Sequence, residues 1–148
     1  MNVDSLLAAW APRVLSIVRI MIALMLLQHP TAKFFGIPHV AFFDHLPMLS
    51  IYMIAGVIEL VGGIAFLLGF YTRTVAFLLS GHLAFAYFIG LAPKGFFPLL
   101  NGGESAVLFC FIFLYYAFVG GGSWSLDAAL GPRSLDAVLR QADRAHAL

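Results

Sequence analysis

The sequence contains few charged residues and a single cysteine. Only 10% of its 148 residues are Asp, Glu, Lys or Arg, and the basic ones are scattered. Scattered cations do not form the basic surface that nucleic acid requires, so no nucleic-acid partner is expected. Cys110 alone excludes an internal disulfide and a CxxC redox motif. Haem, flavin and nucleotide-binding motifs are also absent from the sequence, so no cofactor is expected to be intrinsic to this chain.

Apolar residues make up 62% of the chain, far more than in an ordinary soluble domain. Four apolar stretches, at about residues 13–35, 51–70, 74–91 and 102–119, approach the ~20 residues that a helix needs to cross a bilayer. We therefore expect an all-α integral membrane protein, a four-helix transmembrane bundle in contact with lipid. The membrane domain is predicted over residues 1–122, with a short cytoplasmic amphipathic tail at 123–148.

The predicted tail contains an internal repeat. The segment SLDAAL at 125–130 recurs as SLDAVL at 134–139, and each copy begins with a Ser that can cap a short helix. In the second copy an apolar face opposes a ladder of charged residues. This pattern is typical of a helix that lies on the membrane surface or binds a partner.

The distribution of Lys and Arg predicts the orientation. One side of the predicted bundle carries Arg13, Arg73, Arg133, Arg140 and Arg144, and the other carries Lys33 and Lys94. Because cytoplasmic segments are enriched in Lys and Arg, both termini are expected in the cytoplasm. The aromatic loops at 36–50 and 92–103 would then face outward.

Glu59 lies near the middle of the stretch 51–70 and is the only charged residue in it. A carboxylate at this depth costs at least ~2.5 kcal/mol and normally faces the protein interior with a partner. On a helical wheel it shares one stripe with small and aromatic residues, namely Tyr52, Gly56, Gly63 and Phe66. Glu59 is therefore expected to point into the bundle.

Helical depth predicts the partners of Glu59. At ~1.5 Å per residue, Arg19 and His82 lie at a similar depth, and Tyr115 reaches the same layer. Glu59, His82 and Arg19 are the candidate catalytic residues, with Glu59 accepting protons. The alternative is structural: Glu59 pairs with Arg19 to lock the bundle, and His82 is a hydrogen-bonded core residue rather than a proton relay or ligand.

A second polar layer is predicted at the outer end of the bundle. His29, Lys33, Asn101 and Glu104, together with Tyr115, are the candidate substrate-binding residues. No metal site is assigned, although His29, Lys33 and Glu104 could hold a metal or an anion. Asn101 and Glu104 could instead form a capping box, which satisfies helix N–H groups without any ligand. Nearby phenylalanines either pack at the bundle mouth or line a pocket for a flat ring: Phe34, Phe35, Phe42, Phe43, Phe96 and Phe97.

Several of these elements recur together in one known family. Glu59-x-x-Gly62-Gly63, Gly69-x-x-Thr72-Arg73, FPLLNGGE at 97–104 and the early Arg19 together resemble the DoxX family of small four-span bacterial membrane proteins. The resemblance covers about residues 13–122. It implies a place in the bacterial cytoplasmic membrane and an association with membrane redox systems, including a quinone-linked thiosulfate oxidoreductase subunit, and with partner redox proteins.

Three functions are considered. The first is a membrane subunit of a redox system that handles quinone or another lipophilic molecule next to a partner oxidoreductase; as an enzyme it would be one subunit of a quinone-linked oxidoreductase. The second is a structural or assembly subunit of a larger membrane complex, with no chemistry of its own. The third, a small transporter, is less favoured because the sequence shows no inverted repeat and no broken mid-span helix.

Overall fold

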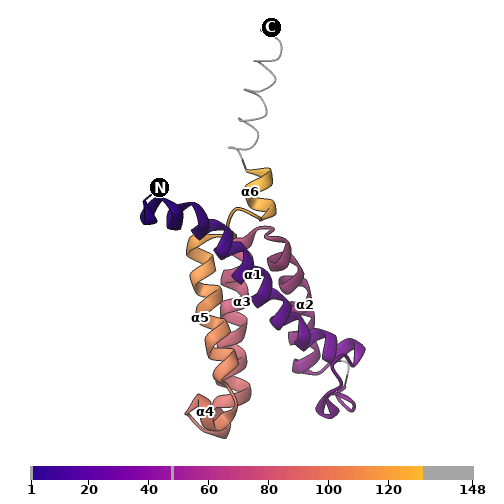
Figure 1. Cartoon of the computed structure of the whole chain (residues 1–148). Coiled ribbons are helices and arrows are strands. Elements are labelled where there is room, and N and C mark those ends of the chain that lie inside the picture. Colours follow the sequence, from indigo (N-terminus) through magenta and orange to yellow (C-terminus); the bar gives the residue numbers. More distant parts are fainter. Residues whose placement is uncertain (1, 48, 132–148) are drawn as a thin grey trace.

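The computed structural model describes residues 2–47 and 49–131, and this part of the chain is helical and contains no strand. The all-α class is thus confirmed. The α-helices of this part, labelled in Figure 1, are α1 (Val3–Phe35), α2 (Ile51–Leu68), α3 (Thr72–Ala86), α4 (Pro98–Asn101), α5 (Glu104–Val119) and α6 (Leu126–Leu130).

Three helical segments are long and apolar enough to cross a membrane: Val3–Phe35, Ile51–Leu68 and Thr72–Lys94. The third consists of α3 continued by a π-helical turn and a short 3-10 turn. The fourth long helix, α5, is apolar but has only 16 residues. The structure therefore supports an integral membrane protein with three or four spans, and the count of four stays a prediction.

Helix α1 is longer than the predicted first span. It begins at Val3 instead of Arg13, is capped by the Asn2 side chain, and continues through Pro12 to Phe35. Its 33 residues correspond to about 50 Å, more than the ~30 Å hydrocarbon core. Arg13, from which depth was counted, therefore lies within the helix and not at its start.

The helices are interrupted at the two places where glycine and proline predict a break. Gly69 and Tyr71 adopt left-handed φ angles of 70° and 47°, which produces the tight turn between α2 and α3. At the other end, α3 runs into the π-helical turn Tyr87–Leu91, the 3-10 turn Ala92–Lys94 and then α4. This second connection is not a continuous helix, as expected from its prolines and glycines.

The helices pack mainly as two pairs, α1 with α2 and α3 with α5, and the pairs are joined where α2 meets α3. In Figure 1, α2 and α3 diverge with distance from the α6 end. Close packing uses glycines of α2: a Cβ built at Gly63 would lie 2.8 Å from the Leu27 side chain. The buried face of α2 contains Met53, Gly56, Glu59, Gly63 and Phe66, whereas Tyr52, expected on that face, is 39% exposed.

The first residues after α5 fold back onto the bundle. Arg19 Nη2 of α1 donates to the Trp124 carbonyl at 2.7 Å. The Asp127 carboxylate accepts from the backbone N–H groups of Tyr71 and Thr72, also at 2.7 Å. The start of the predicted tail is thus held against α1 and the start of α3. The repeat at 134–139 lies outside the described residues, and the division at residue 122 stays a prediction.

Candidate functional site

A buried ionic cluster joins α1, α2 and α3. Lys33 Nζ lies 2.6 Å from Glu59 Oε2, and His82 Nε2 lies 3.5 Å from Glu59 Oε1. The three side chains are 7%, 9% and 10% exposed in the order Lys33, Glu59, His82. We call these three residues the buried triad. The carboxylate is placed between a cation and an imidazole, so its burial is compensated on both oxygens.

The local sequence explains how Lys33 reaches Glu59. Lys33 lies in the last turn of α1, where the helix dipole favours a cation. Gly56, one turn before Glu59 on α2, leaves room for the Lys33 stem: a Cβ built there would lie 3.0 Å from Lys33 Cδ. A glycine at this position therefore lets the lysine side chain cross the face of α2 and place its ammonium group beside the carboxylate.

Lys33 and Glu59, two residues of the buried triad, line a cavity of about 390 Å³, which we call the polar cavity. This volume lies within the range of ligand-binding sites. Lys33 and Glu59 contribute to its wall, as do His29 and Lys94. The rest of the lining is aromatic, apolar or small: Phe42, Phe43, Tyr52, Ala55, Leu83, Ala86, Gly90, Leu91, Gly102, Ser105, Ala106 and Phe109.

The polar cavity combines an aromatic wall with free donors. The rings of Phe42 and Tyr52 meet edge to face at 5.3 Å, and Lys33 Nζ lies 6.0 Å from the centre of the Phe43 ring. An ammonium group has three donors, and the structure shows one of those of Lys33 used by Glu59. A flat ring with oxygen acceptors therefore fits the residues present, since it can stack on aromatic side chains and accept from Lys33.

Arg19 is not part of this cluster, so the predicted ion pair between Arg19 and Glu59 is wrong. Lys33, fourteen residues further along α1 and thus about 21 Å away, pairs with Glu59 instead. Arg19 is 1% exposed and donates to the Trp124 carbonyl near the α2–α3 turn. Its Nε and Nη1 atoms are buried without a hydrogen-bond partner among the described residues.

Tyr115 was expected at the depth of Arg19 and His82 inside the bundle. The structure instead places it on the outer face of α5, where it is 58% exposed and lines an apolar groove against the first half of α1. Its neighbour Tyr116 is the buried residue, and its hydroxyl donates to the Leu15 carbonyl at 2.7 Å. The interior aromatic contact therefore belongs to Tyr116, one residue further along the helix.

Asn101 and Glu104 have separate environments. The Asn101 amide donates to the Gly95 carbonyl at 2.6 Å and accepts from Gly103 N–H at 2.7 Å, so it holds the connection before α5 together. Glu104 is exposed at the first turn of α5, whose N-cap is Gly103 without a side-chain cap. The capping box suggested by their spacing does not form. His29 and Lys33 line the polar cavity, and Asn101 and Glu104 do not.

Among residues 2–47 and 49–131, no group of three His, Cys, Asp or Glu side chains is arranged to hold a metal ion. The alternative of a metal site at His29, Lys33 and Glu104 gains no support from this geometry. Lys33 is already engaged with Glu59, and Glu104 is exposed and does not line the cavity. The arrangement favours hydrogen bonding and proton transfer over metal coordination.

Comparison with known proteins identifies the family of this chain. Residues 14–92 match the DoxX family model. The chain belongs to the DoxX family. It is 45% identical over 130 residues to an uncharacterized protein of Haemophilus influenzae, in an alignment that covers 82% of this chain and 93% of that protein. No solved structure matches the chain. The buried triad and Arg19 all lie within the part that matches the DoxX family model.

Proposed function

We propose that this DoxX protein is a bacterial inner-membrane subunit of a redox system, which binds quinone or another lipophilic molecule in the polar cavity beside a partner oxidoreductase. The observation that carries the proposal is the ion pair of Lys33 and Glu59 in the wall of that cavity, with His82 in contact with Glu59. In lipid, ionisable side chains are rare and mark substrate or proton pathways. Membership of the DoxX family, often linked to redox systems, supports the same function.

The residues divide the task in a definite way. Lys33 donates a hydrogen bond to an acceptor oxygen of the bound ring, and the aromatic wall made by Phe42, Phe43 and Tyr52 orients the ring. Reduction of a quinone adds electrons and protons in equal number. The partner supplies the electrons, while His82 and Glu59 hold and transfer protons, which suits an imidazole and a carboxylate in contact.

The topology follows the charge distribution. Four spans place both termini in the cytoplasm and the loops at 36–50 and 92–103 on the outer side, because the cations near the span ends are concentrated on the other side. In this orientation the polar cavity lies toward the outer half of the bilayer, since it is lined by the end of α1 and the start of α2.

Quinone retention tests the proposal. The wild-type protein, purified with its native membrane partners, is expected to carry a stoichiometric quinone that can be extracted and identified by chromatography. His82→Gln, which leaves the Lys33–Glu59 pair in place, should lower quinone turnover strongly while the complex still assembles. Asp4→Asn, which changes an exposed carboxylate in the first turn of α1, is the control.

The same experiment tests the structural alternative. A quinone-free wild-type complex would contradict the proposal. Loss of assembly in His82→Gln, with normal turnover in whatever complex remains, would assign the buried triad to holding the helices together. That result would favour a structural or assembly subunit.

A further inference from the structure

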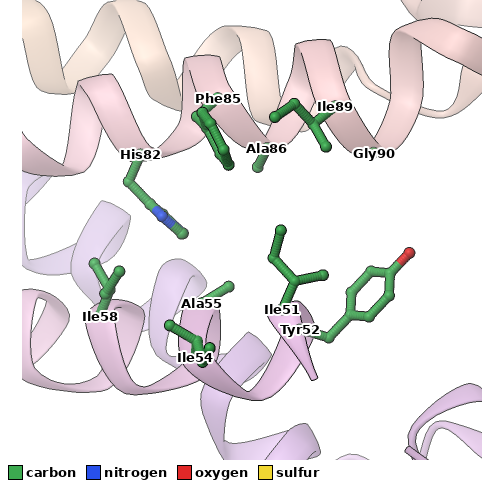
Figure 2. Close-up of a pocket in the computed structure, with 10 residues that line it drawn as sticks. All are labelled: Ile51, Tyr52, Ile54, Ala55, Ile58, His82, Phe85, Ala86, Ile89 and Gly90. Carbon is green, nitrogen blue, oxygen red and sulfur yellow. The ribbon is translucent and has the colours of Figure 1, made fainter. Parts of the chain in front are cut away.

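A second cavity of about 220 Å³ adjoins the polar cavity between α2 and α3. Figure 2 shows Ile51, Ile54 and Ile58 on one helix facing His82, Phe85 and Ile89 on the other. The two cavities share four lining residues: Tyr52, Ala55, Ala86 and Gly90. Only short side chains and the Tyr52 ring therefore separate them.

The local backbone keeps this space open. Ala86 ends α3, and the π-helical turn Tyr87–Leu91 follows at once. Single π-helical turns within helices are frequent at functional sites. Gly90 lies in this turn, and a Cβ built there would meet nothing within 4 Å. The glycine is therefore not required for close helix packing, and its effect is to leave the cavity unfilled.

The second cavity opens toward lipid. Its long side chains, Ile51, Ile54, Ile58, Phe85 and Ile89, are about half-exposed on two of the membrane-spanning segments. Its lining is almost wholly apolar: among its lining residues only His82, with its imidazole, and Tyr52, with its phenol, have polar side-chain groups. The volume is below the ~300 Å³ of typical sites for ring-bearing ligands, so it suits a hydrocarbon chain better than a second ring.

We infer that the second cavity is a lateral portal, through which a membrane amphiphile enters and in which its long hydrocarbon chain stays while its compact head occupies the polar cavity. The inference rests on the proposed function. It adds the chemical class of the ligand, a molecule with one polar ring-sized head and one long apolar chain, and the route by which it enters. His82 lies at the junction, because it lines the portal and contacts Glu59 of the polar cavity.

Two glycines of the α3 segment provide a matched test. Gly90 borders both cavities, whereas Gly81 lies outside their linings and is likewise without any atom within 4 Å of a built Cβ. The probes are a benzoquinone that bears a long alkyl chain with a diazirine at its end, and the same benzoquinone without the chain. Binding and photolabelling are measured in detergent or nanodiscs by mass spectrometry, without any turnover assay.

In the wild-type protein the diazirine is expected to label residues within 51–58 and 82–90. Gly90→Leu should weaken binding of the long-chain probe about tenfold, because excluding roughly two buried methylene groups removes this much affinity. Because Gly90 also lines the polar cavity, the readout is the comparison of the two probes: the chainless probe should lose much less affinity than the long-chain probe. Gly81→Leu should change neither probe. Ile89→Trp is the second obstruction and is used if Gly90→Leu fails to fold; Ile89 lines the second cavity and not the polar cavity, so this variant should weaken the long-chain probe and leave the chainless probe bound as in the wild type.

Equal binding of the long-chain probe to the Gly90→Leu and Gly81→Leu variants, or labelling confined to α1 and α5, would overturn the portal and leave the polar cavity as a binding site. Failure of the wild-type protein to bind either probe would overturn the proposed function and the portal together. Each inference thus has its own negative result.

Discussion

Lys33 Nζ and Glu59 Oε2 are 2.6 Å apart, and more than nine-tenths of both side chains is buried. The pair connects the last turn of α1 to the middle of α2 at the wall of the polar cavity. Removing both charges from such a pair costs less than removing one, because a single buried charge is left without compensation.

Lys33→Met should therefore destabilise the protein more than the double variant Lys33→Met with Glu59→Gln. We expect the single substitution to lower the free energy of unfolding by about 3–5 kcal/mol and the double variant to recover most of this loss. Denaturant unfolding in detergent, followed by circular dichroism, measures both values. Equal losses would show that the two side chains are not energetically coupled.

Gly69→Ala should destabilise the turn between α2 and α3. Gly69 has a left-handed φ of 70°, which costs other residues about 1–2 kcal/mol, and a Cβ there would overlap the Arg19 guanidinium. The expected loss is at least about 2 kcal/mol, because the overlap adds to the backbone cost. Gly81→Ala, at an open helical position of α3, is the control and should stabilise by up to about 1 kcal/mol. Thermal unfolding of the two variants is measured side by side. An equal loss of stability in both would contradict this explanation.

Asp127→Ala should loosen the segment that follows α5. The Asp127 carboxylate accepts from Tyr71 N–H and Thr72 N–H at the start of α3, and loss of a helix cap costs about 0.5–2 kcal/mol. Hydrogen exchange should show lower protection of these two amides. Limited proteolysis should show faster cleavage within 120–131. Asp4→Ala, in the first turn of α1, should leave both unchanged. Unaltered exchange at Tyr71 and Thr72 would mean that the contact contributes no stability.

Cysteine labelling in whole cells tests the proposed topology. Cys110, the single cysteine, is first replaced by Ser, and a cysteine is then introduced in the variants Lys94→Cys or Leu130→Cys, both at exposed positions. A membrane-impermeant maleimide should label the Lys94→Cys variant in intact spheroplasts and the Leu130→Cys variant only after permeabilisation, since cations mark the cytoplasmic side. The reverse pattern would invert the orientation. Labelling of both from one side would reject a fourth span.

Several features of this protein were predictable from the sequence alone. The length and apolar content of residues 51–70 identify a membrane helix, and the cost of a charge in lipid requires Glu59 to face inward. Glycine and proline mark the breaks at 69–73 and 92–103, because local backbone geometry decides them. The motifs around Glu59 and Gly69 identify the DoxX family, which the family match confirms.

The partners of Glu59 depended on tertiary structure. Counting depth from Arg13 gives Arg19 as the nearest cation, but α1 begins at Val3 and crosses α2 so that Lys33 lies beside Glu59 across Gly56. The sequence contained a signal for this contact, since Lys33 and Gly56 flank the first loop on the two helices that it joins. The lysine side chain must still reach from α1 to the Glu59 carboxylate on α2. Whether it can do so depends on how the two helices cross, which the sequence does not reveal.

The sequence by itself determined which segments are helical and apolar, because backbone propensity and transfer into lipid act on each residue locally. The three-dimensional packing decided which polar groups meet: Lys33 and His82 with Glu59, and Arg19 with the segment at 121–127. The physical reason is that an ion pair depends on distances of a few ångströms between helices, and small changes in helix start, crossing and rotation move a side chain by more than that.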